Sequence, residues 1–197
     1  MMLHGSHAER VAVPAGFTWI VPAGADLEAA ACVPIPFGTA DDCLFEFGRL
    51  AAGETVLIQA GASGVGLAAI QLARRAGATV IATAGSDAKL ARLRDELGLD
   101  HGVNYRERDF PAAVAEIAGG RGCDLVVDSV GGATLQGSLA CLGYRGRSIT
   151  VGDASREGRQ LDVSILSAGN RSLTGVFLKA EAFFARTRVH AMIAGHL

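Results

Sequence analysis

The pattern of apolar and polar positions changes at residue 55. From Thr55 onward, short apolar runs rich in β-branched residues alternate with longer segments in which apolar residues recur every three or four positions. The short runs are typical of strands buried on both faces of a parallel sheet, and the longer segments of helices that bury one face. The predicted strands are Thr55–Ala60, Thr79–Ala84, His101–Tyr105, Asp124–Ser129, Arg147–Gly152 and Ser172–Leu178.

Helices are predicted between these strands. Residues with capping preferences mark their limits: Gly77, Gly98 and Gly143 where helices should end, and Ser86 and Asp109 where they should begin. Six strands joined by right-handed helical crossovers predict an α/β fold. We expect a Rossmann, doubly wound, six-stranded parallel sheet in the order 3-2-1-4-5-6, with helices on both faces and a ligand crevice at the carboxyl end of the first strand.

The first 22 residues have a different pattern. His7–Val13 and Phe17–Val21 look like two short strands, broken by Pro14 and Pro22. Residues 1–22 are therefore interpreted as remnant strands of another domain, and residues 23–197 as the Rossmann domain. Within the latter, Asp26–Leu50 predicts two helices, split by two prolines, that lead into the first strand.

Composition restricts the classes of function. The chain has 197 residues, of which 50% are hydrophobic and 19% charged, with a formal net charge of -2. No broad basic field is available for nucleic acid, and no apolar run is long enough to span a membrane. The four cysteines lie far apart without metal-ligand spacing, and no secretory signal is visible. We expect a soluble, cytoplasmic protein with reduced thiols.

A glycine-rich turn follows the first predicted strand directly. Gly61-Ala62-Ser63-Gly64-Val65-Gly66 ends where the next helical stripe begins. Glycines there let the backbone approach a pyrophosphate closely, and the helix start offers unpaired N–H groups and the positive end of its dipole. The strand, the turn and the helix together indicate dinucleotide binding rather than a merely structural turn.

The end of the second strand indicates which dinucleotide is bound. An acidic residue there would hold the ribose hydroxyls of NAD, but this chain has Ala84-Gly85-Ser86. A carboxylate about 4 Å from a 2′-phosphate would cost roughly 4 kcal/mol at an effective dielectric constant of about 20. Its absence favours NADP(H), and Ser86 and Lys89 can supply a hydroxyl and a cation. Two alternatives remain open: Ser86 only caps the helix and Lys89 is only solvated, or Asp87 binds the ribose.

With these residues in place, the chain resembles the medium-chain dehydrogenase/reductase superfamily, and within it the quinone oxidoreductase, or zeta-crystallin-like, branch. The resemblance covers essentially the whole chain. It rests on the glycine turn and on a series of short motifs: His7-Ala8-Glu9 with Val13-Pro14, Pro34–Thr39 before Ala40-Asp41-Asp42, Gly53–Ile58, Ala84-Gly85-Ser86 with Lys89, Asn104-Tyr105-Arg106, Asp128–Gly132, Gly146-Arg147 and Ser172–Gly175.

The resemblance implies roles for individual residues. The pyrophosphate would be held by Ser63, Gly64, Val65 and Gly66, and the 2′-phosphate would be surrounded by Ser86, Lys89 and Tyr105 beside Gly85. The nicotinamide half of the crevice would be lined by Thr39, Ser129, Val130, Val151 and Gly152. Tyr105 has an alternative role in closing the third strand, and Ser129 one in satisfying backbone groups at a strand end.

The reaction implied by the resemblance is hydride transfer from NADPH to a quinone or a conjugated carbonyl compound. In relatives the substrate is held by a GroES-like catalytic domain, of which residues 1–22 would be the last strands. We therefore name no catalytic residue and no metal ligand, and we expect this chain alone to be inactive. His101 and His190 are single histidines without a partner at metal-binding or catalytic spacing.

Other functions remain alternatives. The chain could be a nucleotide-binding module or redox sensor without activity of its own, or part of an enoyl reductase or a zinc alcohol dehydrogenase. The glycine turn and the Gly85-Ser86 pair favour the zinc-independent branch. A short-chain dehydrogenase is disfavoured because neither tyrosine has a lysine four residues later, and a methyltransferase because Gly85 takes the place of the ribose-binding acid. We also expect a homodimer through Ser172–Leu178 as an exposed edge strand.

Overall fold

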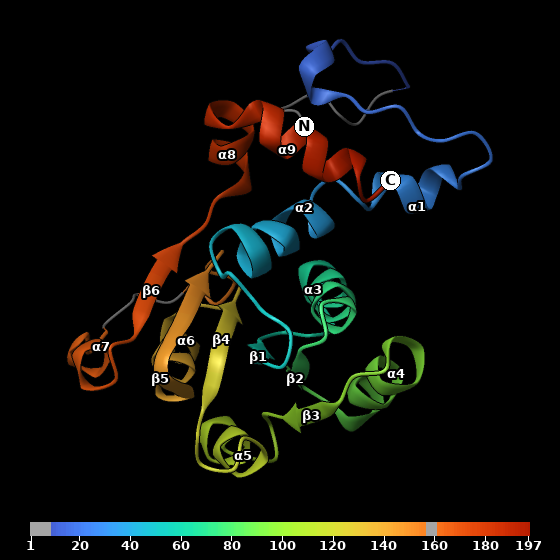
Figure 1. The fold of residues 1–197 in the computed structure, drawn as a ribbon. Coiled ribbons are helices and arrows are strands. Elements are labelled where there is room, and N and C mark those ends of the chain that lie inside the picture. Colours follow the sequence, from blue (N-terminus) through green and yellow to red (C-terminus); the bar gives the residue numbers. More distant parts are fainter. Residues whose placement is uncertain (1–8, 157–160) are drawn as a thin grey trace.

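The computed structural model describes residues 9–156 and 161–197 and contains one six-stranded sheet (Figure 1). All strand pairs are parallel, and the strand order is β3-β2-β1-β4-β5-β6, which confirms the predicted topology. The strands are β1 (Thr55–Ile58), β2 (Thr79–Ala84), β3 (His101–Asn104), β4 (Cys123–Asp128), β5 (Leu142–Thr150) and β6 (Ser172–Gly175).

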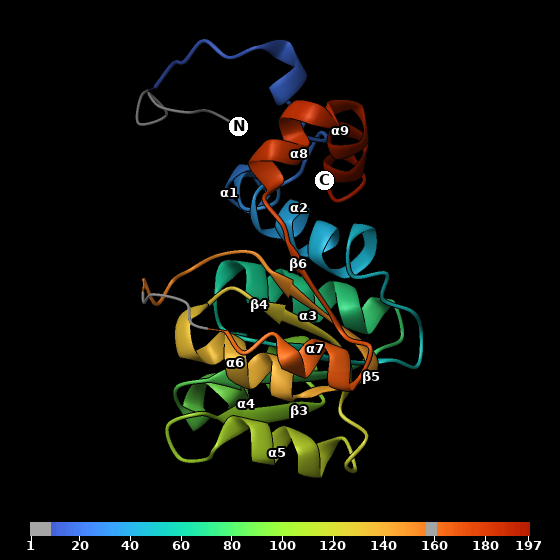
Figure 2. The ribbon, with the colours of Figure 1, turned by 90° about the vertical axis from the view of Figure 1, so that its left-hand side faces the viewer.

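Two hydrophobic cores lie on the two faces of the sheet. Val56 and Ile58 of β1 belong to the first core, whereas Leu57 between them belongs to the second, because successive side chains of a strand point to opposite faces. The first core is covered by α3 (Gly64–Arg75) and α4 (Asp87–Leu97). The second is covered by α5 (Phe110–Ile117), α6 (Gly132–Ala140) and α7 (Ser164–Ala168), so helices lie on both faces as predicted (Figure 2).

The predicted helix limits are mostly confirmed. Ser86 and Asp109 cap α4 and α5 through their side-chain oxygens. Gly98 at the end of α4 has a φ of 66°, a left-handed conformation that favours glycine. Gly143 is the exception: α6 ends at Ala140, and Gly143 lies inside β5, where a Cβ would come within 2.5 Å of the Arg121 carbonyl oxygen. Close backbone packing, not helix termination, requires glycine there.

The two strands predicted at the N-terminus are wrong within the described residues. Residues 9–22 contain no strand, only the single 3₁₀ turn η1 (Ala15–Phe17), and residues 7 and 8 of the first prediction lie outside the described part. A strand needs a neighbour to pair its backbone groups, and no described strand runs beside this segment. The assignment of residues 1–22 to another domain stays a prediction.

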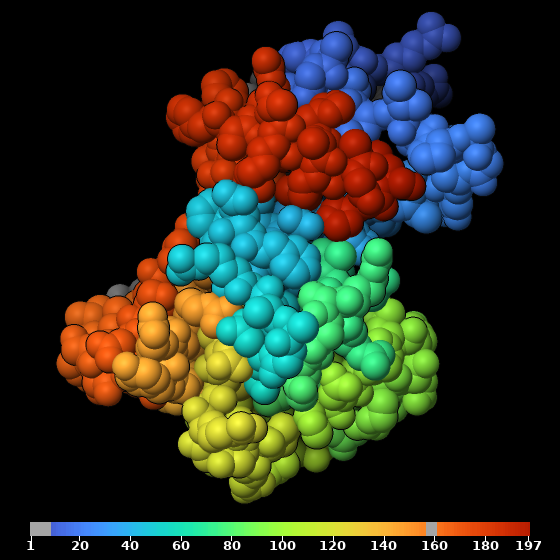
Figure 3. Space-filling model, viewed as in Figure 1, coloured from blue at the N-terminus to red at the C-terminus, as the bar shows by residue number. Residues whose placement is uncertain are grey.

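The N-terminal segment instead packs on two C-terminal helices. Phe17 and Trp19 cover a small core formed by α8 (Leu178–Phe184) and α9 (Arg186–Ala194). Figure 3 shows this lobe, in red, directly beside the segment that precedes β1. That segment consists of α1 (Leu27–Ala31), α2 (Pro36–Asp41) and the π-helical turn η2 (Asp42–Glu46). The two helices predicted within Asp26–Leu50 are therefore present. Among the described residues, no helix combines the length and apolarity needed to cross a membrane.

The last strand is shorter than predicted. β6 ends at Gly175, Val176 is buried in the first core with 6% of its surface exposed, and Leu178 already begins α8. Helix α8 turns the chain away from the sheet, and the side chains of Val176 and Leu178 are buried in hydrophobic cores instead of lying at an exposed sheet edge. Of the apolar residues predicted for an exposed edge, Phe177 is 64% exposed.

Candidate functional site

The glycine turn joins β1 to α3 in a strained, tightly packed conformation. Ala60 has a φ of 52°, which is uncommon for a residue other than glycine. A Cβ on Gly61 would lie 2.8 Å from the Cβ of Ala82, and one on Gly66 would lie 2.5 Å from the Ala60 carbonyl oxygen. These two glycines are therefore required by the close packing of α3 on the sheet.

Gly64 is different, because the protein leaves space beside it. An added Cβ would meet only Pro36, at 3.6 Å, and the φ of Gly64 is not positive. Ser63 caps α3, and its Oγ accepts a hydrogen bond from the Gly66 amide at 3.1 Å. Among the described residues, the Gly64 and Val65 amides donate no backbone or side-chain hydrogen bond. Of the four residues predicted to hold the pyrophosphate, these two thus offer free amides, whereas the Gly66 amide is occupied.

The end of β2 lies against the residues that follow β3. In the sheet Ala84 pairs with Asn104, which places Tyr105 beside Gly85. The Tyr105 hydroxyl oxygen lies 2.7 Å, and the Arg106 Nε 3.3 Å, from the position that a Gly85 Cβ would take. A side chain at position 85 would therefore displace the ends of the Tyr105 and Arg106 side chains, and Arg106 joins the predicted residues as a cation that the sequence reasoning did not assign.

Ser86 and Lys89 lie in the first turn of α4, next to Gly85. Ser86 accepts a hydrogen bond from the Lys89 amide at 3.4 Å, so it does cap the helix, while its hydroxyl hydrogen is left to donate. The Lys89 side chain is exposed. Asp87, the alternative ribose ligand, accepts a hydrogen bond from the Asn104 Nδ2 at 3.2 Å.

The loop after β4 is organised by a buried aspartate. Asp128 has no exposed surface, and its Oδ1 accepts hydrogen bonds from the amides of Val130 at 2.8 Å and Gly131 at 2.9 Å. This turn carries Ser129 and Val130, two residues predicted for the nicotinamide half of the crevice. Asp128 was recognised only as part of a motif, and its role in holding the loop was not predicted.

The remaining predicted residues lie at two places. The Val151 amide donates to the Asp128 carbonyl at 2.9 Å, and a Cβ on Gly152 would lie 3.1 Å from the Ser129 carbonyl oxygen, so the ends of β4 and β5 adjoin. Thr39 is 7% exposed and belongs to α2, which packs on α3 and whose Pro36 faces Gly64.

Buried hydrogen bonds connect the glycine turn to the loop after β4. The Thr83 hydroxyl accepts from the Ala60 amide at 3.2 Å and donates to the Gln59 Oε1 at 2.7 Å. Gln59 Nε2 donates to the Ser138 hydroxyl at 3.1 Å, which donates to the Asp128 Oδ2 at 2.8 Å. Sequence reasoning missed Gln59, Thr83 and Ser138; for Gln59 and Thr83, a polar residue at the end of a buried strand was a usable signal, whereas Ser138 lies within α6.

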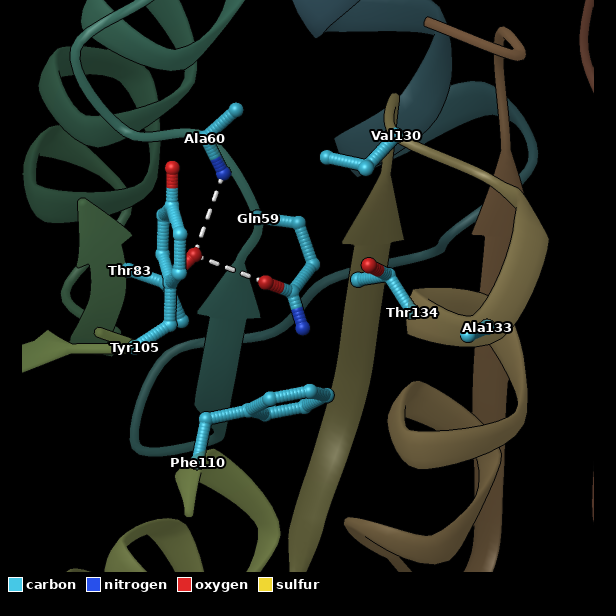
Figure 4. Close-up of a pocket in the computed structure, with 8 residues that line it drawn as sticks. All are labelled: Gln59, Ala60, Thr83, Tyr105, Phe110, Val130, Ala133 and Thr134. Atoms are coloured by element: carbon cyan, nitrogen blue, oxygen red, sulfur yellow. Dashed lines mark hydrogen bonds between the residues drawn. The ribbon is translucent and has the colours of Figure 1, made fainter. Parts of the chain in front are cut away.

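A pocket of about 380 Å³ opens below the glycine turn (Figure 4). In this view Tyr105 lies on one side of Gln59, Val130, Ala133 and Thr134 lie on the other, and Phe110 lies below it. The pocket is therefore situated where the strand order reverses, between the carboxyl ends of β1 and β4, which is where doubly wound folds bind ligands. Of the predicted site residues, Tyr105 and Val130 line it.

His101, His190 and the three buried cysteines lie outside the residues that line this crevice. His101 begins β3, at the opposite end of the strand, and the ring of His190 is hydrogen-bonded to the Thr18 carbonyl at 3.0 Å. Burial raises the pKa of Cys43, Cys123 and Cys141 to about 12, so these thiols are poor nucleophiles. Residues 9–156 and 161–197 contain no group of three His, Cys, Asp or Glu side chains placed to hold a metal ion.

Three solved structures are similar to this chain. A quinone oxidoreductase of Pseudomonas syringae superposes with a TM-score of 0.84 at 28% identity, covering 91% of this chain and 55% of that one. The nucleotide-binding subdomain of the enoylreductase domain of PpsC from Mycobacterium tuberculosis has a TM-score of 0.74 at 32% identity, covering 83% and 91%. The mycobacterial protein Rv1454c, solved with NADPH, has a TM-score of 0.83 at 34% identity, covering 93% and 56%.

Sequence relatives include multidomain synthases. The highly-reducing polyketide synthase 1 of Aureobasidium melanogenum is 43% identical over 136 residues, which cover 68% of this chain and 6% of the synthase. The chain thus spans less than a tenth of the length of such relatives.

A family model described as zinc-binding dehydrogenase matches residues 64–193, more than half of the chain. The described residues do not fit a zinc site, and no step below uses one. The glycine turn, the sheet order and the crevice at its switch point all lie in, or lead directly into, the matched range. The chain therefore belongs to the zinc-binding dehydrogenase family, within the medium-chain dehydrogenase/reductase superfamily.

Proposed function

We propose that this chain binds NADPH along the crevice and forms the nucleotide-binding part of an enoyl reductase. The observation that carries the proposal is the end of β2, where position 85 carries no acidic side chain, where Tyr105 and Arg106 lie against Gly85, and where Ser86 and Lys89 follow in the first turn of α4. Two cations and two hydroxyls suit a phosphate dianion better than a pair of ribose hydroxyls.

With the 2′-phosphate bound beside Gly85, the pyrophosphate and the nicotinamide would lie further along the crevice. The free amides of Gly64 and Val65 stand at the positive end of the α3 dipole, which favours the charge of a pyrophosphate. The nicotinamide would then reach the ends of β4 and β5, where Ser129, Val130, Val151 and Gly152 lie near Thr39 on α2. These residues would position the ring and exclude water from one of its faces.

When bound, NADPH supplies a hydride: the conjugated C=C bond of an enoyl thioester accepts it at the β-carbon, and a proton from solvent goes to the α-carbon. No described residue that lines the crevice is a histidine, and we propose that this chain contributes binding and orientation of the nucleotide. Substrate contacts would come from a companion domain.

The choice of enoyl thioesters as substrates is supported by the relatives. A polyketide synthase matches at 43% identity, and a nucleotide-binding subdomain of an enoylreductase domain matches over 91% of its length. Quinone reduction is the second candidate, favoured by the superposition with the Pseudomonas syringae quinone oxidoreductase at a TM-score of 0.84.

Calorimetric titration with NADPH and NADH tests the cofactor proposal. Wild type should prefer NADPH, and Lys89→Ala should lose about 10- to 150-fold in NADPH affinity, because one charged hydrogen bond contributes roughly 1.5–3 kcal/mol. Lys179→Ala is the matched control, since Lys179 is an exposed lysine on α8 outside the crevice. Preference for NADH, or equal effects of the two substitutions, would remove the basis of the assignment.

Turnover separates the candidate substrates. NADPH oxidation is followed with crotonyl thioester and with 9,10-phenanthrenequinone, first with this chain alone and then with the chain joined to a substrate domain of the same family. We expect no turnover alone, and thioester reduction in the joined protein. Reduction of the quinone only would favour the second candidate.

A further inference from the structure

Asp87 is the one acidic residue in the first turn of α4, and it directly follows Gly85 and Ser86. A free carboxylate at this place would have two opposite effects. It would accept hydrogen bonds from ribose hydroxyls, which favours NADH, and it would repel a 2′-phosphate, which disfavours NADPH. Its position therefore matters for the choice between the two nucleotides.

Asn104 holds this carboxylate. Asn104 is 6% exposed at the end of β3, and its Nδ2 donates to the Asp87 Oδ1 at 3.2 Å. On its other side the Asn104 Oδ1 accepts from the Arg106 amide at 3.2 Å. Because a backbone amide can only donate, the oxygen of the Asn104 side chain must face Arg106, and its NH₂ group must face Asp87.

The same asparagine also shapes the turn that carries the cation. The Asn104 carbonyl accepts from the amides of Glu107 at 3.1 Å and Arg108 at 3.0 Å, so the chain turns back immediately after β3. This turn presses Tyr105 and Arg106 against Gly85. The buried Asn104 side-chain amide thus lies between the negative Asp87 carboxylate, to which it donates, and the positive Arg106, whose backbone amide it accepts from.

We propose that Asn104 sets the preference for NADPH over NADH by keeping the Asp87 carboxylate bound at the end of β3 and away from the 2′-phosphate site proposed beside Gly85. This inference rests on the nucleotide-binding function proposed above and assigns Asn104 as a specificity-determining residue that acts through Asp87. A neutral amide suits the task, because it donates to the carboxylate without adding a charge to the pocket.

A purely structural role for Asn104 makes a different prediction. If the side chain only closed β3 and supported the following turn, its removal would weaken both nucleotides by similar factors. If it acts through Asp87, the two affinities change in opposite directions, and the effect requires the negative charge of Asp87. The ratio of the two affinities therefore distinguishes the roles.

The experiment measures NADPH and NADH affinities by calorimetry for wild type, Asn104→Ala, Asp87→Asn and the double variant. Asn104→Ala should lower the NADPH-to-NADH affinity ratio by about tenfold, because a released Asp87 carboxylate would be free to repel a 2′-phosphate and to accept from ribose hydroxyls. In the Asp87→Asn background the same substitution should leave the ratio unchanged. Asp95→Asn, an exposed carboxylate eight residues further along α4, is the matched control and should change nothing.

Each outcome has one meaning. Wild type that binds neither nucleotide, or prefers NADH, contradicts the proposed function itself. If wild type prefers NADPH but Asn104→Ala leaves the NADPH-to-NADH affinity ratio unchanged, only the role of Asn104 is overturned. The same holds if Asn104→Ala changes this ratio equally in the wild-type and Asp87→Asn backgrounds. Circular dichroism checks folding. If Asn104→Ala does not fold, Asp87→Glu replaces it, because the longer carboxylate reaches past Asn104 and must lower the ratio if the proposal is right.

Discussion

Substituting Gly64 should separate the stability of the fold from the binding of the nucleotide. A Cβ at Gly64 meets only Pro36, at an ordinary contact distance of 3.6 Å, and the backbone there is helical. Gly64→Ala should therefore raise the free energy of unfolding by about 0.4–1 kcal/mol, because alanine restricts the unfolded chain. Nothing in the fold requires glycine at this position.

Binding should change in the opposite direction. The added methyl group occupies the space through which a pyrophosphate would reach the Gly64 and Val65 amides, so at least one charged hydrogen bond is lost or lengthened. The loss of one such bond, roughly 1.5–3 kcal/mol, corresponds to a weakening of NADPH binding by about 10- to 150-fold. Urea unfolding measures the first quantity and calorimetry the second.

Two further substitutions make this test specific. Gly195→Ala, at the C-terminal end of α9, is the control for binding, since an added Cβ there meets only the Met192 and Ala191 carbonyl oxygens, at 3.4 and 3.7 Å, and Gly195 is not among the residues assigned to the crevice. Gly66→Ala should instead destabilise the fold, by about 1–3 kcal/mol, because its Cβ would lie 2.5 Å from the Ala60 carbonyl oxygen. A Gly64→Ala variant that binds NADPH like wild type would refute the reasoning about backbone approach.

Three other predictions concern the described structure. Ser138→Ala removes the link between two buried polar groups and should lower the free energy of unfolding in urea by about 2 kcal/mol or more. Arg147 makes two hydrogen bonds of 2.8 Å to Glu54 and thereby lowers the pKa of that carboxyl below its ordinary 4.5. The stabilisation from this pair is therefore present above pH 4.5 and lost as the pH falls through the lowered pKa, so Arg147→Met should cost about 2 kcal/mol at pH 7 and less in acid, where the hydrogen bonds of Arg147 to the Gly48 and Arg49 carbonyls remain. Finally, if the outer edge of β6 forms a homodimer, Phe177→Lys, at a residue that is 64% exposed, should give a monomer in sedimentation velocity, whereas an unchanged dimer would place the interface elsewhere.

The sheet could be predicted from the sequence because its signals are local. Each strand is a short apolar run, and right-handed crossovers leave few ways to order six parallel strands. The failures occur where the neighbours of a segment decide its structure. Residues 9–22 have an alternating pattern but no strand beside them, and Val176 continues an apolar run although the chain leaves the sheet at Gly175.

The site residues that are neighbours in the sequence were predicted, and those that meet only in the folded sheet were not. Gly85, Ser86 and Lys89 follow one another along the chain, so their meeting at the end of β2 was visible in the sequence. Asn104 and Arg106 reach the same place only through the register in which Ala84 pairs with Asn104. That register is a tertiary property, and a list of motifs does not contain it.

The buried hydrogen bonds between the two sides of the crevice have a fixed direction. A hydroxyl has one hydrogen to donate, so Thr83, which donates to Gln59, must accept from the Ala60 amide. Ser138 likewise donates to Asp128 and must accept from Gln59. The Asp128 carboxylate, which can only accept hydrogen bonds when ionised, is the last member of this series of hydrogen bonds. It also accepts hydrogen bonds from the Val130 and Gly131 amides of the loop after β4. Because no member can reverse its role without leaving a buried group unpaired, the spacing between the glycine turn and that loop is set by the protein before a nucleotide arrives.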